Sequence, residues 1–209
     1  AALSAVAAQC AVEHLLLPFE AADFGAAQAA AERAWDWSGG IDVLVNNAGI
    51  SQRSLAIDTD FTVYRRMIEV DLLGPIAVTQ ALLRRMAARG GGRIVMMSSL
   101  AGKIGSPLRS AYSAAKHGVV GLIRGVAMDL AETNITANAV SPGSTDTAML
   151  EASARIYQLH SSESFIEQQP IGRLLQPSEV AASIAWLCSP HSSGMTGANL
   201  AVDGGMTVN

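Results

Sequence analysis

Residues 93–99 read Arg-Ile-Val-Met-Met-Ser-Ser, a run of four apolar residues that ends on two serines. A short apolar run without polar alternation is typical of a strand buried on both faces, as in a parallel sheet. Three glycines at 90–92 precede the run, and a loop rich in Gly and Ser follows it before helical spacing begins near Ser110. The stretch therefore predicts a strand, a connecting loop and a helix, in that order.

The same alternation of strand and helix patterns extends over the whole chain. Helices are expected at residues 1–9, 24–37, 58–88, 110–132, 146–169 and 177–188, and strands at 14–19, 41–45, 93–98, 135–140 and 199–202. The helix at 58–88 should bend or be interrupted near Gly74-Pro75. Repeated alternation predicts an α/β fold: a single domain over residues 1–209, with a doubly wound parallel sheet and helices on both faces, in three layers. Ligands of such folds bind beyond the carboxyl ends of the strands.

Composition narrows the classes of function. Half of the 209 residues are hydrophobic, 15% are charged and the formal net charge is −4, so no cationic face for nucleic acid is expected. No apolar run reaches the roughly 20 residues of a membrane helix, and no signal peptide opens the chain. Cys10 and Cys188 lie far apart without metal-ligand spacing, so no metal is expected. These features favour a cytoplasmic protein with reduced cysteines.

The strongest chemical signal is the pair Tyr112 and Lys116. Four residues apart in a helical pattern, they share one face of the helix. A free tyrosine ionises only near pH 10, but a neighbouring ammonium favours the phenolate, so the pair can donate and accept a proton near neutral pH. Taken alone, such a pair is more often a surface contact. Ser99 adds a hydroxyl at the end of a buried strand, where it could bind a substrate oxygen or merely cap the loop; Ser98 is more typical of a structural role.

Two further loops follow buried strands. Asn46-Asn47-Ala48-Gly49 follows the strand at 41–45, and Ser141-Pro142-Gly143, with Thr145 and Thr147 close behind, follows the strand at 135–140. Each alone could be a polar turn. Two asparagines between a strand and a glycine also suggest a backbone held near a ligand.

Together, in this order, these motifs resemble the short-chain dehydrogenase/reductase (SDR) superfamily. The resemblance extends from Phe19 to the end of the chain. It includes Pro170-Ile171-Gly172-Arg173-Leu174, Pro177-Ser178-Glu179-Val180-Ala181, Thr196-Gly197 and Val202-Asp203-Gly204-Gly205, which are similar to 3-oxoacyl-carrier-protein reductases and 3-hydroxyacyl-CoA dehydrogenases. It implies a Rossmann-like fold and an NAD(P)-dependent oxidoreductase that interconverts a ketone and a secondary alcohol. The alternative is a non-catalytic cofactor-binding or scaffolding protein of the same fold.

The resemblance also implies roles for individual residues. Tyr112 would exchange a proton with the substrate oxygen, Ser99 would hold that oxygen, and Lys116 would favour the phenolate and bind the nicotinamide ribose. The cofactor, NAD or NADP, would contact the residues Glu20 and Ala21 at its adenine, Asn47, Ala48 and Gly49 along the site, and Pro142, Gly143, Thr145 and Thr147 at its carboxamide. The substrate would be a small carbonyl or alcohol compound.

The sequence departs from the family pattern at two places. It contains no Thr-Gly-x-x-x-Gly-x-Gly turn, so the first strand–helix–strand portion is expected to be absent, and a stable monomer is doubtful. Asp71 stands where the family often has an asparagine of a proton relay through the lysine. We expect the relay to use the backbone carbonyl, so that Asp71 substitutes with little loss. If the side chain takes part, its negative charge would disfavour the phenolate and shift the pH optimum.

The sequence motifs say less about which residues contact the substrate and a partner subunit than about the catalytic residues. The resemblance implies a homodimer or homotetramer packed through the helices at about 60–88 and 110–131. Residues 146–170 are expected to form a lid, and the loop 101–109 a wall of the substrate pocket. Arg109 either meets an acidic group of the substrate or is a solvated loop residue. Five apolar or aromatic residues of this segment either line an apolar substrate pocket or pack the lid against the core: Met149, Leu150, Ile156, Tyr157 and Phe165.

Overall fold

The computed structural model describes residues 2–157 and 159–208. Residues 1, 158 and 209 lie outside the described part of the chain. All three belong to the predicted domain, and residue 158 also belongs to the predicted lid. The sheet has four parallel strands in the order β1-β2-β3-β4: Val43–Asn46, Gly92–Met97, Ile135–Pro142 and Asn199–Val202. The longest α-helices are α2 (Phe24–Ser38), α4 (Gly74–Arg89), α5 (Ser110–Asp129) and α7 (Pro177–Cys188).

Shorter elements connect these. They are the α-helices α1 (Ala2–Ala7), α3 (Phe61–Ile68) and α6 (Ala148–Ile156), the π-helix η1 (Glu69–Leu73), and the 3-10 helices η2 (Leu100–Gly102), η3 (Ser162–Gln168) and η4 (Pro190–Ser192). No helix among the described residues combines the length and the apolar character needed to cross a membrane.

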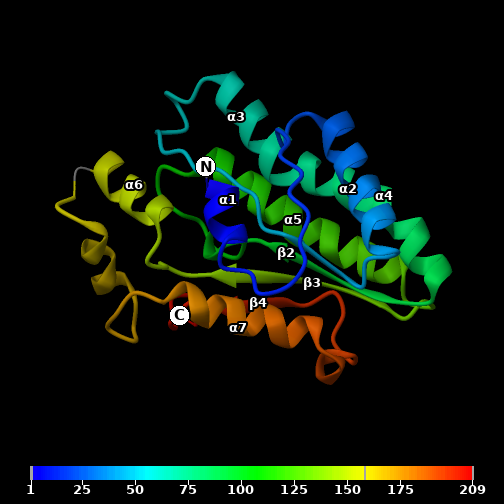
Figure 1. Ribbon diagram of the computed structural model, residues 1–209. Coiled ribbons are helices and arrows are strands. Elements are labelled where there is room, and N and C mark those ends of the chain that lie inside the picture. Colours follow the sequence, from blue (N-terminus) through cyan, green and yellow to red (C-terminus); the bar gives the residue numbers. More distant parts are fainter. Residues whose placement is uncertain (1, 158, 209) are drawn as a thin grey trace.

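Helices cover both faces of the sheet, which confirms the predicted doubly wound α/β fold. In Figure 1, α2, α4 and α5 lie on one side of the strands and α7 lies on the other. The pleat of β2 shows why: Ile94 and Met96 pack into the core beneath α4 and α5, whereas Val95 packs with Val180 of α7 on the opposite face. The central strands β2 and β3 are thus buried by helices on two sides, as expected of a parallel sheet, whereas Val43 and Val45 of the edge strand β1 are partly exposed.

Local sequence signals set the ends of these helices. Asp23 caps α2, because its Oδ1 accepts a hydrogen bond from the N–H of Ala26 at 3.0 Å. Gly90 ends α4 with φ of 94°, a left-handed conformation that favours glycine. The predicted interruption near Gly74-Pro75 is also found: the π-helix η1 separates α3 from α4, and the Gly74 N–H bonds to the Glu69 carbonyl five residues earlier.

The predicted strand at 14–19 is wrong. This segment has no regular secondary structure in the described chain, and Leu15, Leu16 and Phe19 are 36–45% exposed. A strand needs a neighbour for its backbone hydrogen bonds, and β1 pairs only with β2. Pro18 also lacks a backbone donor. The apolar run therefore has the composition of a strand but pairs with no neighbouring strand in the described chain.

Candidate active site

A cavity of about 930 Å³ opens at the carboxyl ends of β1, β2 and β3. The loops that follow these strands form one side, and α6, η3 and α7 form the other. The predicted site residues among its lining are Asn47, Gly49, Asp71, Ser99, Tyr112, Lys116, Pro142, Gly143, Thr145 and Thr147. The three loops singled out in the sequence therefore meet at one place, because parallel strands end at the same edge of a sheet.

Tyr112 and Lys116 lie on the buried face of α5, at 8% and 4% exposure. The Lys116 Nζ is 5.6 Å from the centre of the Tyr112 ring. It also donates a hydrogen bond to the Met97 carbonyl at 3.0 Å, which ties α5 to the end of β2. The surface-contact reading of this pair is thereby excluded, because both side chains are buried in the wall of the cavity.

A buried carboxylate completes the surroundings of the lysine. Asp71, in η1, is 1% exposed, and its Oδ2 lies 3.2 Å from the Lys116 Nζ. Its Oδ1 accepts a hydrogen bond from the Ile50 N–H at 2.8 Å. Burial raises the pKa of Asp71 above its usual value, while the Lys116 charge and the Ile50 bond oppose that rise. Pro75 has no backbone N–H, so it cannot form the usual α-helical hydrogen bond with the Asp71 carbonyl four residues earlier.

Gly49 stands against this ion pair. A Cβ at Gly49 would lie 3.3 Å from both the Asp71 Oδ2 and the Lys116 Nζ, tighter than most contacts of a real Cβ. The absence of a side chain therefore lets the loop after β1 approach the pair and deliver the Ile50 N–H.

The two serines after β2 have separate environments. Ser98 is buried and donates a hydrogen bond to the Lys116 carbonyl at 3.1 Å, so its role is structural. Ser99 caps η2, with its Oγ accepting from the Ala101 N–H at 3.2 Å, and it also lines the cavity. Its hydroxyl proton remains available to a ligand oxygen, because the cap uses only a lone pair.

The two asparagines after β1 divide in the same way. Asn46 turns inward, and its Nδ2 donates to the Thr79 Oγ1 on α4 at 3.0 Å. Asn47 is exposed toward the cavity and lines it, whereas Ala48 is exposed and is not among the lining residues. Asn46 therefore anchors the end of the strand, which leaves Asn47 as the polar group that faces the cavity.

The loop after β3 is fixed by backbone contacts. The Gly143 N–H donates to the Val202 carbonyl at 3.0 Å, and a Cβ at Gly143 would lie 2.8 Å from the Asp203 Cα. Thr145 donates to the Gly143 carbonyl, and Thr147 caps α6 through the Leu150 N–H. Both threonines line the cavity, so the loop presents hydroxyl groups from a fixed backbone.

Glu20 and Ala21 lie apart from this cavity. Glu20 forms an exposed ion pair with Arg66 of α3, its Oε1 at 2.9 Å from the Nη2. The hydrogen bonds from the Ala22 backbone and from Arg66 lower the pKa of Glu20. The Ala21 carbonyl lies against Gly74, where a Cβ would meet it at 2.5 Å. Their proposed contact with adenine stays a prediction.

The far wall of the cavity contains residues of the predicted lid together with residues that the sequence patterns did not single out. Met149, Leu150, Tyr157 and Phe165 of the predicted lid line it, and the side chain of Ile156 lies outside the described part of the chain. Residues that were missed are Ser144, Ser153, Gln168, Pro177, Val180, Ala181, Ile184 and Met206. The four that lie on α7 recur at helical spacing: Pro177, Val180, Ala181 and Ile184. This spacing predicts a buried helix face, so the sequence could have indicated these residues.

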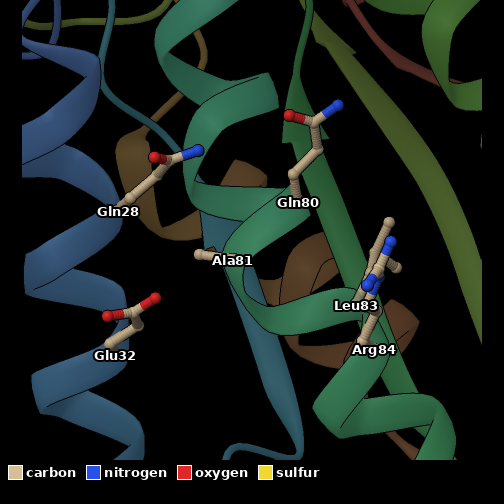
Figure 2. Close-up of a pocket in the computed structure, with 6 residues that line it drawn as sticks. All are labelled: Gln28, Glu32, Gln80, Ala81, Leu83 and Arg84. Carbon is tan, nitrogen blue, oxygen red and sulfur yellow. The ribbon is translucent and has the colours of Figure 1, made fainter.

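A second hollow lies on the outside of α2 and α4. Figure 2 shows its side chains spread apart: Gln28 and Glu32 extend from α2, while Leu83 and Arg84 of α4 point away from them. These groups do not converge on a common point, so this hollow carries no site.

The cavity fits the nicotinamide half of a dinucleotide. Its position beyond the strand ends, the close approach of the Gly49 backbone, and the polar groups of Asn47, Lys116, Thr145 and Thr147 suit a flat polar ring with a ribose. Fold and site thus define a Rossmann-type oxidoreductase that uses a nicotinamide cofactor.

Comparisons with known proteins agree with this class. Residues 1–207 match the family model described as Enoyl-(Acyl carrier protein) reductase. The chain is 44% identical over 173 residues to cis-4-hydroxycyclohexanecarboxylate dehydrogenase of Sinomonas cyclohexanicum, covering 81% of this chain and 67% of that enzyme. It is 42% identical over 193 residues to the trans-4-hydroxycyclohexanecarboxylate dehydrogenase of the same organism, covering 92% and 71%.

A solved structure extends the likeness to three dimensions. A variant of actinorhodin polyketide ketoreductase with NADPH superposes with a TM-score of 0.85 at 35% identity, covering 91% of this chain and 76% of that one. The chain therefore belongs to the short-chain dehydrogenase/reductase superfamily. It is an NAD(P)-dependent oxidoreductase, which confirms the prediction from sequence, and no finding favours the non-catalytic alternative.

Proposed function

We propose that Tyr112, Ser99 and Lys116 interconvert a ketone and a secondary alcohol in the cavity at the strand ends. Reduction adds a hydride to the carbonyl carbon and a proton to its oxygen, and oxidation removes both. The observation that supports these roles is the common placement of the three groups: a buried phenol, a buried ammonium and a serine hydroxyl in the wall of one cavity.

The geometry accounts for each step on the protein. The Lys116 charge near the Tyr112 ring stabilises the phenolate that forms when Tyr112 gives up its proton. Tyr112 can therefore donate a proton to the substrate oxygen in reduction and accept it in oxidation. Ser99 donates to that oxygen and stabilises its developing charge. When bound, the nicotinamide supplies or accepts the hydride. Asn47, Thr145 and Thr147 orient the cofactor from the two flanking loops.

Other parts of the molecule fit this activity. Residues 146–170 form the lid over the cavity, since α6 and η3 supply much of the wall opposite Tyr112. The protein forms a homodimer or homotetramer through α4 and α5 and acts in the cytoplasm. The relatives from Sinomonas cyclohexanicum are named for hydroxy acids of a six-membered ring, so cyclic hydroxy and oxo acids are the first substrates to test.

A Tyr112→Phe variant tests the proposal. Turnover of an oxo acid with NADPH or NADH, followed by loss of reduced-nicotinamide absorbance, should fall at least about 100-fold, because the proton donor is removed. Tyr64→Phe is the matched control: it also loses a tyrosine hydroxyl, which is partly buried and hydrogen-bonded to Ser110, but it lies outside the cavity and should stay within about threefold.

Equal activity of Tyr112→Phe and the parent would overturn the assignment. Binding of the cofactor by the parent without turnover of any ketone would instead point to a protein of this fold that senses or carries the cofactor.

A further inference from the structure

We propose that the substrate carries a carboxylate and that Arg109 binds it. This inference rests on the proposed function and adds the chemical class of the substrate. Arg109 occupies the position just before α5, three residues before Tyr112, and lines the same cavity as Ser99 and Tyr112.

The balance of charge in the cavity singles out this arginine. Three of its lining residues, Asp71, Lys116 and Arg109, have acidic or basic side chains. Asp71 and Lys116 form an ion pair with each other. Within the described residues, no carboxylate lies within 4.0 Å of the Arg109 guanidinium. The cavity wall therefore presents one uncompensated positive charge, which an anionic group of the substrate would neutralise.

The guanidinium is held in place rather than free in solvent. Its Nε donates to the Tyr157 hydroxyl at 3.2 Å. Its Cζ is 5.7 Å from the centres of both the Tyr112 and Tyr157 rings. Tyr157 is itself fixed by Phe165, edge to face at 5.5 Å between ring centres, and by the Arg53 guanidinium over its ring. The Nε contact leaves the two Nη groups to make a paired contact with a carboxylate.

The backbone before Arg109 is constrained in the same way. Leu108 has a φ of 62°, which is uncommon for a residue other than glycine, and its carbonyl accepts a hydrogen bond from the Ser54 N–H at 3.0 Å. Strained backbone tends to persist where the surroundings fix a functional geometry. The turn directs Arg109 over the Tyr112 ring instead of away from the helix.

This placement fixes how the substrate would lie. A carboxylate on Arg109 holds one end of the molecule beside Tyr112, and the reacting carbon must then reach the Tyr112 hydroxyl and Ser99. A compact oxo acid meets this demand, with the two groups separated by a short ring or chain. The apolar side chains of Leu150 and Phe165 would contact the carbons between them.

Paired ketones test the inference. The parent should reduce 4-oxocyclohexanecarboxylate with at least about tenfold higher kcat/KM than 4-methylcyclohexanone, because a charge-assisted contact is lost with the neutral ketone. Arg109→Gln should raise the KM for the acid by roughly 10- to 100-fold and change kcat/KM for the neutral ketone less than about threefold. Arg109→Lys should recover part of the loss, since lysine keeps the charge without the fork geometry.

Two controls separate binding from folding. Arg33→Gln removes an exposed arginine of α2 outside the cavity and should behave as the parent. Tyr157→Phe keeps Arg109 but removes the hydroxyl that positions it, so the KM for the acid should rise by a smaller factor with kcat little changed. In the parent, added salt should raise the KM for the acid and leave that for the neutral ketone unchanged.

A measurement without turnover distinguishes this inference from the proposed function. Cyclohexanecarboxylate should bind the parent in the presence of NADP, by calorimetry, and bind Arg109→Gln at least about tenfold more weakly. That result stands even if no ketone is reduced, in which case only the proposed function fails. Equal loss of both ketones in a folded Arg109→Gln, or equal binding of the acid by parent and variant, would overturn the inference.

Discussion

At the scale of single residues, Asp71 raises the sharpest question, because it places a carboxylate beside the lysine of the proposed catalytic pair. We expected the backbone carbonyl of this residue to serve and the side chain to matter little. The structure brings the side chain itself into contact with Lys116, at 3.2 Å, in a site almost closed to solvent. The carboxylate is therefore positioned to act on the lysine directly.

An Asp71→Asn variant tells the two contributions apart. It should keep the bond to the Ile50 N–H and the carbonyl, so turnover should stay within about tenfold of the parent. Removing the negative charge leaves the surroundings of Tyr112 more positive and favours the phenolate. The acidic limb of the kcat/KM profile for alcohol oxidation should then move to lower pH.

The control is Asp203→Asn, a buried aspartate that does not line the cavity and should leave the profile in place. An Asp71→Asn profile that coincides with the parent would restrict the role of this residue to its backbone.

The sequence predicted the site best where its residues are close along the chain or directly follow a strand. Tyr112 and Lys116 share a helical face because of their spacing, and Ser99 follows a strand that its apolar run defines. The contacts of Asp71 with Lys116 and of Arg109 with Tyr157 join segments far apart in sequence. No periodic pattern encodes which segments pack together, so these contacts required the structure.

At the scale of elements, the start of α7 depends on one carboxylate. The Glu179 side chain accepts the Gln176 N–H at 2.8 Å and forms two hydrogen bonds with Arg173. The bond to Arg173, followed by that to Gln176, lowers the pKa of Glu179 to about 2. Because its folded pKa lies below the usual 4.5, the charged carboxylate stabilises the fold above about pH 4.5, and this contribution is lost as the pH falls toward 2.

Replacing Glu179 by Gln should therefore lower Tm at pH 7 by up to a few degrees. The difference from the parent should shrink steadily between pH 4.5 and 2, in thermal unfolding followed by circular dichroism. Glu167→Gln, at an exposed glutamate of η3, serves as a control that should show no such trend. A difference in Tm that is constant with pH would contradict the role of the charge.

The elements also show where sequence patterns succeed and fail. The strands at 41–45, 93–98, 135–140 and 199–202 were found because their apolar runs are bounded by glycine or polar turns. The segment 14–19 has an equally apolar run but no hydrogen-bonding neighbour, so it forms no strand. Apolar composition reports the capacity for burial, whereas a strand also depends on pairing that lies outside its own sequence.

At the scale of the whole molecule, the three layers explain why one edge carries the chemistry. The sheet and the helices α4, α5 and α7 form a packed body, and the polar loops gather at the carboxyl ends of its strands (Figure 1). The segment with α6 and η3 closes the cavity from the far side. A fixed wall that bears Tyr112 and Lys116 therefore faces a wall built from short helices, which is the arrangement expected of a lid.

The outer face of α5 gives the last prediction, on assembly. His117, Gly121, Gly125 and Met128 recur along this face and are exposed, and a Cβ at either glycine would meet nothing within 4 Å in the described part of the chain beyond its own helix. Such a face allows close approach of a second α5, and in a twofold interface Met128 lies against the same surface of the partner.

Met128→Glu would bury charge there and should weaken the assembly at least about tenfold, seen as a smaller mass in sedimentation. Ile57→Glu, at an exposed site elsewhere, should leave the mass unchanged. If Met128→Glu sediments as the parent does, the two long helices do not form the interface.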